Sequence, residues 1–263
     1  MKSMKNALML AVVAAGCAAV GTASATTVDI QFLGASGHPP ATSFTGSQGA
    51  YTGDGVSSPT WNGVSPVAAG TSGSATNLVA SNGVATSENV AVTMTNSYVS
   101  TPTTTYANAG GANNLLESYF IDKPGPGTVT LTGLADSGSY QLYVYSGSGS
   151  YNNAITNFAF TTGTGSAAAG SNAGVVNVSN KNTSFVENTN YVVFNAIADA
   201  TGTLAIRYSA GTNSAGTGPG EADINGLQVV SATTPIPEPA TLGLVAMAGA
   251  LGMLLVSRKR KNA

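Results

Sequence analysis

The sequence predicts an all-β protein, a single β-sandwich or jelly-roll domain over residues 26–232. Apolar and polar residues alternate with a period of two in many short runs. These runs are rich in Val, Thr, Tyr and Phe, and clusters of Gly, Ser, Asn, Asp and Pro separate them. The chain of 263 residues holds 33 glycines, and only 8 % of its residues are charged, far below the usual quarter.

Nine runs carry the alternation, and together they suggest about ten short strands closed over one core. They are 28–33, 90–99, 128–134, 140–145, 156–161, 175–178, 191–198, 203–208 and 224–230. One segment, 113–121, predicts a helix because Leu115, Leu116, Tyr119 and Phe120 would share one face. The long polar segments 35–59 and 209–220 predict surface or binding loops.

The N-terminus has the three parts of a secretory signal peptide over residues 1–25. A basic start precedes an apolar stretch, and Ala23 and Ala25 form a small-x-small cleavage site. The mature chain should therefore begin at Thr26 after export by the Sec translocon. A lipobox ending at Cys17 is the alternative, although Ala14 stands where such boxes usually carry Leu.

The C-terminus has three parts as well. A proline-rich linker, 233–239, contains Pro237, Glu238 and Pro239, and an uncharged stretch, 240–257, is just long enough to cross a bilayer as a helix. The basic tail 258–263 follows, with Arg258, Lys259, Arg260 and Lys261 expected to stay cytoplasmic and to set the topology. Residues 26–235 would then lie outside the inner membrane.

This C-terminal arrangement closely resembles the PEP-CTERM sorting signal. The resemblance implies recognition by an exosortase, a membrane protease that removes the tail and passes the protein to the cell surface or extracellular matrix. A plain tail anchor is the alternative, but it would not need the Pro-Glu-Pro motif.

The domain between the two signals resembles the galactose-binding-like jelly rolls found in PEP-CTERM proteins. The segments that carry this second resemblance are 28–32, 61–62, 82–84, 130–134, 140–145 and 225–229. The resemblance implies a fold rather than an activity.

Charge and composition exclude several classes of function. Residues 26–235 hold three basic and ten acidic residues, so no basic face for nucleic acid is expected. The single cysteine lies in the leader, and the single histidine, His38, leaves no His-pair zinc site. A Ser-His-Asp triad would depend on His38, and no Gly-x-Ser-x-Gly elbow presents a serine.

The candidate ligand-binding residues are loop aromatics. Tyr51, Trp61 and Tyr151 lie in or near loops rich in Asn and Gly, where an aromatic face and amide groups could hold a sugar. The alternative for Trp61, the sole tryptophan, is an anchor in the core. Tyr51 and Tyr151 are also compatible with exposed loop positions that have no function.

Carboxylates offer two further hypotheses. Asp29, Glu221 and Asp223 could contribute oxygen ligands to a structural Ca²⁺, which galactose-binding-like domains often carry; no other cofactor is expected. Glu221 and Asp223 also superficially resemble a laminarinase-type catalytic strand, but Asn225 replaces the acid/base carboxylate. The alternative is that Glu221 and Asp223 belong to an ordinary strand and face water.

The sequence thus predicts a secreted, non-enzymatic structural or adhesive protein of the cell surface or exopolysaccharide matrix. It would be anchored transiently in the inner membrane before sorting. A lectin-like carbohydrate-binding module is the alternative, and a glycosidase or polysaccharide lyase is a third hypothesis.

Overall fold

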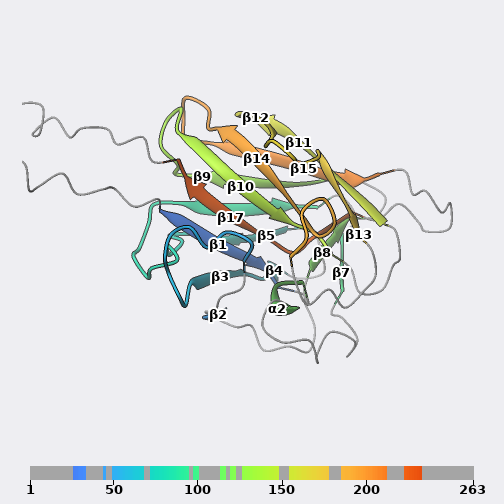
Figure 1. Cartoon of the computed structure of the whole chain (residues 1–263), viewed down its shortest axis with the longest axis horizontal. Coiled ribbons are helices and arrows are strands. Elements are labelled where there is room, and N and C mark those ends of the chain that lie inside the picture. The colour runs from blue at the N-terminus through green and yellow to red at the C-terminus, as the bar shows by residue number, and fades with distance from the viewer. Residues whose placement is uncertain are drawn as a thin grey trace, which may run out of the picture. The chain divides into compact units, whose positions relative to one another are not determined.

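Two seven-stranded β-sheets face each other in this computed structural model, and a small three-stranded sheet accompanies them (Figure 1). The structure describes residues 26–33, 44–45, 49–67, 72–94, 97–100, 113–116, 119–122, 126–147, 154–177, 185–211 and 222–232. All of them belong to one compact unit, Ala25–Ala232.

The first sheet is mixed, with strand order β12-β14-β10-β17-β1-β3-β2. Only the β1–β3 pairing in it is parallel. Its strands are β12 (Thr164–Ala167), β14 (Tyr191–Ile197), β10 (Ser139–Tyr145), β17 (Gly226–Ser231), β1 (Thr27–Phe32), β3 (Thr60–Val64) and β2 (Phe44–Thr45). Figure 1 looks onto this sheet.

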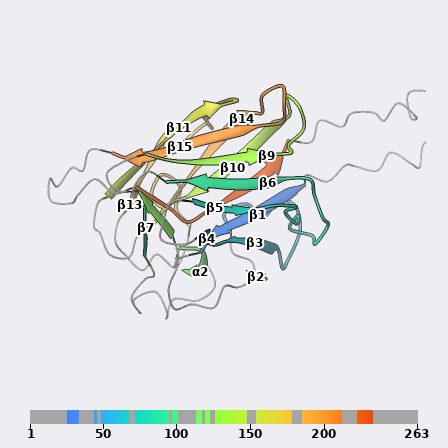
Figure 2. The ribbon, with the colours of Figure 1, turned by 180° about the vertical axis from the view of Figure 1, so that it is seen from behind.

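The second sheet is antiparallel throughout, with strand order β13-β11-β15-β9-β6-β5-β4. Figure 2 shows the molecule from behind, with this sheet toward the viewer. Its strands are β13 (Gly174–Asn177), β11 (Ala154–Thr162), β15 (Leu204–Ala210), β9 (Gly127–Thr132), β6 (Asn89–Thr93), β5 (Ser72–Ala75) and β4 (Pro66–Val67). The three-stranded sheet orders β16 (Ala222–Ile224), β8 (Tyr119–Asp122) and β7 (Ser97–Ser100). One short helix, α2 (Asn113–Leu116), completes the described elements.

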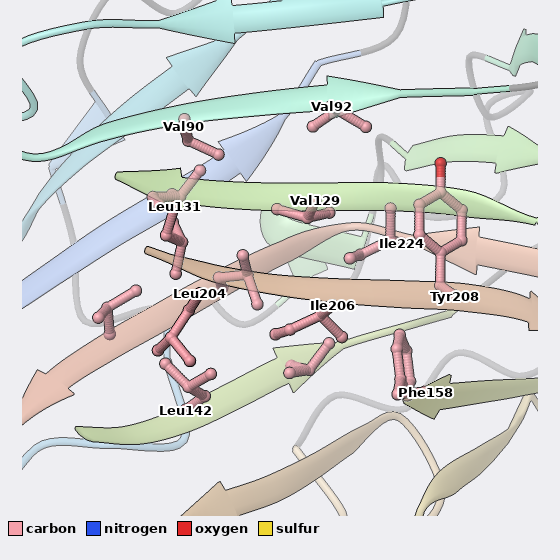
Figure 3. Packing of buried hydrophobic residues seen from close by; sticks show 14 of the residues in the cluster. Val90, Val92, Val129, Leu131, Leu142, Phe158, Leu204, Ile206, Tyr208 and Ile224 are labelled. Atoms are coloured by element: carbon pink, nitrogen blue, oxygen red, sulfur yellow. The ribbon is translucent and has the colours of Figure 1, made fainter. Parts of the chain in front are cut away.

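The core fills the space between the two large sheets, because each strand points alternate side chains toward the facing sheet. Val129, Leu131 and Ile206 of the second sheet gather there with Leu142 of the first (Figure 3). Consecutive strands from β9 to β15 alternate between the two sheets, as strands do in a jelly roll. The all-β sandwich expected from the sequence is therefore confirmed.

Three of the predicted elements are corrected by the structure. The expected strand 90–99 is two strands, because β6 pairs in the second sheet and β7 in the three-stranded sheet. The expected helix 113–121 ends at Leu116, and the following β8 pairs with β7 and β16 instead. The run Tyr-Phe-Ile favours a strand once partners are available on both sides, and tertiary pairing overrides the apolar helical stripe.

The third correction concerns 224–230, which divides at Asn225 into β16 and β17. The backbone N–H of Asn225 donates to the Tyr145 carbonyl over 2.9 Å, and its side-chain Oδ1 accepts the Gly147 N–H at 2.6 Å. These bonds allow the chain to change sheets there. The sequence also missed β3, the two-residue strands β2 and β4, and β5 and β12, which consist mainly of small residues.

Both expected signals, 1–25 and 233–263, lie outside the described residues, and so does the expected membrane span 240–257. Within the part of the chain that the structure describes, no helix has the length and apolar character needed to span a membrane.

Candidate functional site

The outer face of the first sheet carries aromatic side chains, whereas its inner face carries the aliphatic core. In β10, Leu142 and Val144 point into the sandwich, so Tyr143 and Tyr145 point outward on the opposite face. β14 places Tyr191 on the same outer face, because Tyr145 and Tyr191 stand opposite each other in the antiparallel ladder.

Three partly exposed tyrosines form a continuous row on this face, which we call the tyrosine platform: Tyr51, Tyr143 and Tyr191. The Tyr143 and Tyr191 rings lie 6.1 Å apart between centroids at an interplanar angle of 29°. Tyr51 meets the other side of Tyr143, with centroids 5.4 Å apart and an angle of 47°. The Tyr143 hydroxyl donates to Gln141 Oε1 at 3.0 Å, which adds an amide at the margin.

Tyr51 reaches the platform because hydrogen bonds hold its loop against the sheet. The backbone N–H of Tyr51 donates to Gln228 Oε1 at 3.0 Å, and Gln228 Nε2 donates to the Tyr51 carbonyl at 3.2 Å. The neighbouring N–H of Ala50 donates to the Tyr145 hydroxyl at 2.7 Å. Within the segment 35–59 expected to be a loop, residues 49–59 lie outside the strands and rest on the outer sheet face, whereas Phe44–Thr45 form strand β2.

Asp29 lies beneath this loop in a buried polar network. Its side chain is fully buried, and Gln228 Nε2 donates to Asp29 Oδ1 over 2.8 Å. The Tyr145 hydroxyl donates to the other end of the same amide, Gln228 Oε1. Burial raises the pKa of Asp29 from 3.8 to about 7; the Gln228 bond lowers this pKa and the nearby charge of Asp54 raises it. Asp29 Oδ2 has no hydrogen-bond partner, which fits a carboxyl group that holds a proton.

Trp61 is 2 % exposed and lies next to Asp29 in the parallel β1–β3 pair. Its ring meets Tyr145 edge-on at 6.5 Å and contributes to a small apolar cluster with Leu115 and Leu116. An enclosed ring cannot stack on a ligand, so the suggested binding role of Trp61 is corrected and the core-anchor alternative fits its burial. Tyr51 is partly exposed, and Tyr151 lies outside the described residues.

The two described members of the proposed carboxylate ligand set lie on strands of different sheets. Asp29 lies on β1 of the first sheet and Asp223 on β16 of the three-stranded sheet, while Glu221 lies outside the described residues. Among the residues described, no three His, Cys, Asp or Glu side chains form a group able to hold a metal ion. Asp223 is 1 % exposed, which corrects the expectation that the acids of this strand face water.

Sequence reasoning missed Tyr143, Tyr191 and Gln228. A signal for Tyr143 was present in 140–145, where Tyr143 alternates with the core residues Leu142 and Val144. No local signal connects Tyr143 with Tyr191, because a long stretch of chain separates them and only the β10–β14 pairing brings them together.

No family model matches the chain, and no curated protein matches it. The structure has a distant likeness to a family 35 carbohydrate-binding module from Clostridium thermocellum, at 18 % identity over 54 % of this chain and 92 % of that one. The TM-score of this match is 0.30.

Proposed function

We propose that this protein binds polysaccharide through the tyrosine platform, without catalysis, and thereby acts as an adhesive or structural component of the cell surface or exopolysaccharide matrix. The observation that carries the proposal is the row of three contacting tyrosines on the outer face of the first sheet. Sugar rings present C–H faces that stack on aromatic rings, and their hydroxyls bond to amides and carboxylates beside those rings.

The platform has the features that such a ligand needs. Its rings are partly exposed, and Gln141 and Glu187 supply polar groups next to them. A row along neighbouring strands suits an extended chain of sugars better than a single small molecule. Because the loop of Tyr51 is pinned by Gln228, little ordering of that loop would be needed on binding.

The proposal is tested with a glycan array and polysaccharide pull-downs on fragment 26–232, which contains every described strand. Tyr51→Ala and Tyr191→Ala should each weaken binding about tenfold, since the loss of one stacking ring removes roughly 1 to 1.5 kcal/mol. Ile197→Ala is the matched control, because Ile197 shares a strand and face with Tyr191 and is 47 % exposed. Unchanged binding in both tyrosine variants, or no glycan binding by the wild type, would refute the platform as a carbohydrate site.

We also propose that an exosortase sorts the protein to the cell surface through Pro237, Glu238 and Pro239. The support is the order of that motif, the uncharged stretch 240–257 and the basic residues after it. Replacing the three motif residues with alanine should leave the full-length mature protein in the inner-membrane fraction. Deleting 258–261 is the control, because it weakens orientation but keeps the motif. Normal processing of the triple-alanine variant would instead indicate an ordinary anchor.

A further inference from the structure

Glu187 lies at one end of the tyrosine platform, in the turn that leads into β14. The backbones of Glu187 and Tyr191 form an isolated parallel β-bridge, and the N–H of Asn188 donates to the Tyr191 carbonyl at 2.8 Å. Burial raises the pKa of the Tyr191 hydroxyl, and the Glu187 charge raises it further. The pKa of the Tyr143 hydroxyl is raised as well, by burial first, then by Tyr51 and Tyr191, and also by the Glu187 charge. The Glu187 carboxylate therefore acts on two of the three platform rings.

The turn that carries Glu187 is held in place by side-chain amides. Asn190 Oδ1 accepts the Val186 N–H at 2.8 Å, and Asn188 adopts the left-handed region with φ of 63°. Asn188 is fixed in turn, since its Oδ1 accepts the Asn172 N–H at 2.6 Å and its Nδ2 donates to the Gly170 carbonyl at 2.8 Å. The carboxylate is thus presented from a defined backbone position rather than from a loose loop.

Asp54 supplies a second carboxylate at the opposite end, beside Tyr51. Its Oδ2 accepts the Ser81 hydroxyl at 2.7 Å, and its Oδ1 accepts the Val56 N–H at 3.1 Å. Burial and the charge of Asp54 both raise the pKa of the Tyr51 hydroxyl, burial more strongly. Negative charge accordingly stands at both ends of the row.

Positive charge is absent from the described surroundings of the platform. Arg207 is the only basic residue among those that the structure describes, and it lies on β15 of the other large sheet, paired with Thr128 of β9. A polysaccharide rich in uronate, sulfate or phosphate groups would meet like charge here. An ammonium group would pair with a carboxylate and would also be attracted to the tyrosine faces.

We propose that the platform selects polysaccharides with free amino groups, such as polymers of glucosamine, and that Glu187 is the residue that sets this preference. This inference rests on the proposed carbohydrate-binding function and specifies its ligand. A chain of sugars would stack on the tyrosines and place protonated amines toward Glu187 and Asp54. N-acetylation removes the charge, so the acetylated polymer would keep the stacking and lose the ionic attraction.

The experiment compares three hexasaccharide probes by titration calorimetry at low salt, at a pH below the pKa of the sugar amine. The probes are the glucosamine hexamer, its fully N-acetylated form and a galacturonic acid hexamer. We expect the tightest binding for the glucosamine hexamer and a weakening with added salt. Glu187→Gln should reduce its affinity about fivefold and Glu187→Lys about tenfold or more, a clearly larger loss than either variant causes for the acetylated probe.

Asp136→Asn is the matched control, because Asp136 is an exposed acid in the β9–β10 turn, away from the platform, and loses the same charge. It should leave all three affinities unchanged. Two results would overturn the selectivity while leaving the carbohydrate-binding function intact. One is equal affinity for free and acetylated amines with no effect of Glu187→Gln, and the other is tightest binding of the galacturonic acid probe. If no probe and no arrayed glycan binds the wild type, the proposed function fails and this inference fails with it.

Discussion

Asp29→Asn should make the folded protein more stable at neutral and alkaline pH. Asp29 is fully buried, and only its Oδ1 has a hydrogen-bond partner, Gln228 Nε2 at 2.8 Å. Asparagine has nearly the same shape, keeps an oxygen to accept that bond and carries no charge. The substitution therefore imitates the protonated carboxyl group at every pH.

The expected size follows from the pKa of Asp29, which burial raises from 3.8 to about 7, against the opposing effect of the Gln228 bond and with a further rise from Asp54. Between these two values the folded state binds more protons than the unfolded state, so stability falls as pH rises. The contribution is fully present below about pH 4 and is lost by about pH 7. Three pKa units correspond to about 4 kcal/mol as an upper bound, so we expect Asp29→Asn to gain about 2 to 4 kcal/mol at about pH 8.

The assay is urea unfolding of fragment 26–232 at several pH values, with a chelator present so that no divalent cation contributes. Burial also raises the pKa of Glu88 to about 7, which gives both proteins a similar background slope. Only the difference between wild type and Asp29→Asn therefore reports on Asp29. A variant that is less stable than the wild type at about pH 8, or a difference that stays constant down to about pH 4, would show that Asp29 is ionised in the folded protein.

Four further outcomes are expected. Gln228→Leu removes four hydrogen bonds and should cost about 2 to 4 kcal/mol in urea unfolding, with increased proteolysis of the Tyr51 loop; unchanged cleavage would contradict the anchoring of that loop. Gly202→Ala should cost more than Gly170→Ala, because both have positive φ but only at Gly202 would a Cβ collide with a backbone carbonyl; equal losses would leave only the backbone term of about 1 to 2 kcal/mol. Sequencing of the secreted protein should give Thr26 as the first residue, whereas a lipidated Cys17 would indicate a lipoprotein. Fragment 26–232 should melt cooperatively with a β-type circular dichroism spectrum, and a gradual melt would show that it needs another part of the chain or a partner.

Sequence periodicity located the strands whose two faces differ. In β9 and β10 the apolar residues alternate strictly with polar or aromatic ones, and both strands match the runs expected at 128–134 and 140–145. The same periodicity could not show that 90–99 changes sheets, because after the polar residues 95–97 an apolar side chain returns at Tyr98 in the same phase as Val90 and Val92. It also gave no signal for β5 and β12, because their Gly, Ser and Ala residues differ too little in hydrophobicity between the two faces of the strand.

The candidate site was only partly accessible to sequence reasoning. Tyr51 was recognised as a loop aromatic, and the structure places it in the platform. Trp61 has a similar local context but is enclosed by Tyr145 and Leu115, which come from distant segments. Local composition indicates that an aromatic residue lies near a loop, but it does not show what covers the ring.

By itself, the sequence determined the all-β class, the strongly alternating strands and the scarcity of basic residues in 26–235, because these depend on residue type and local spacing. Only the tertiary structure decided which side chains meet. Strand pairing set Tyr143 beside Tyr191, and the loop folded over β1 turned Asp29 from a strand residue into a buried carboxyl group. Such contacts join residues far apart in the chain, and hydrogen-bond register and packing between sheets, which no local window contains, select them.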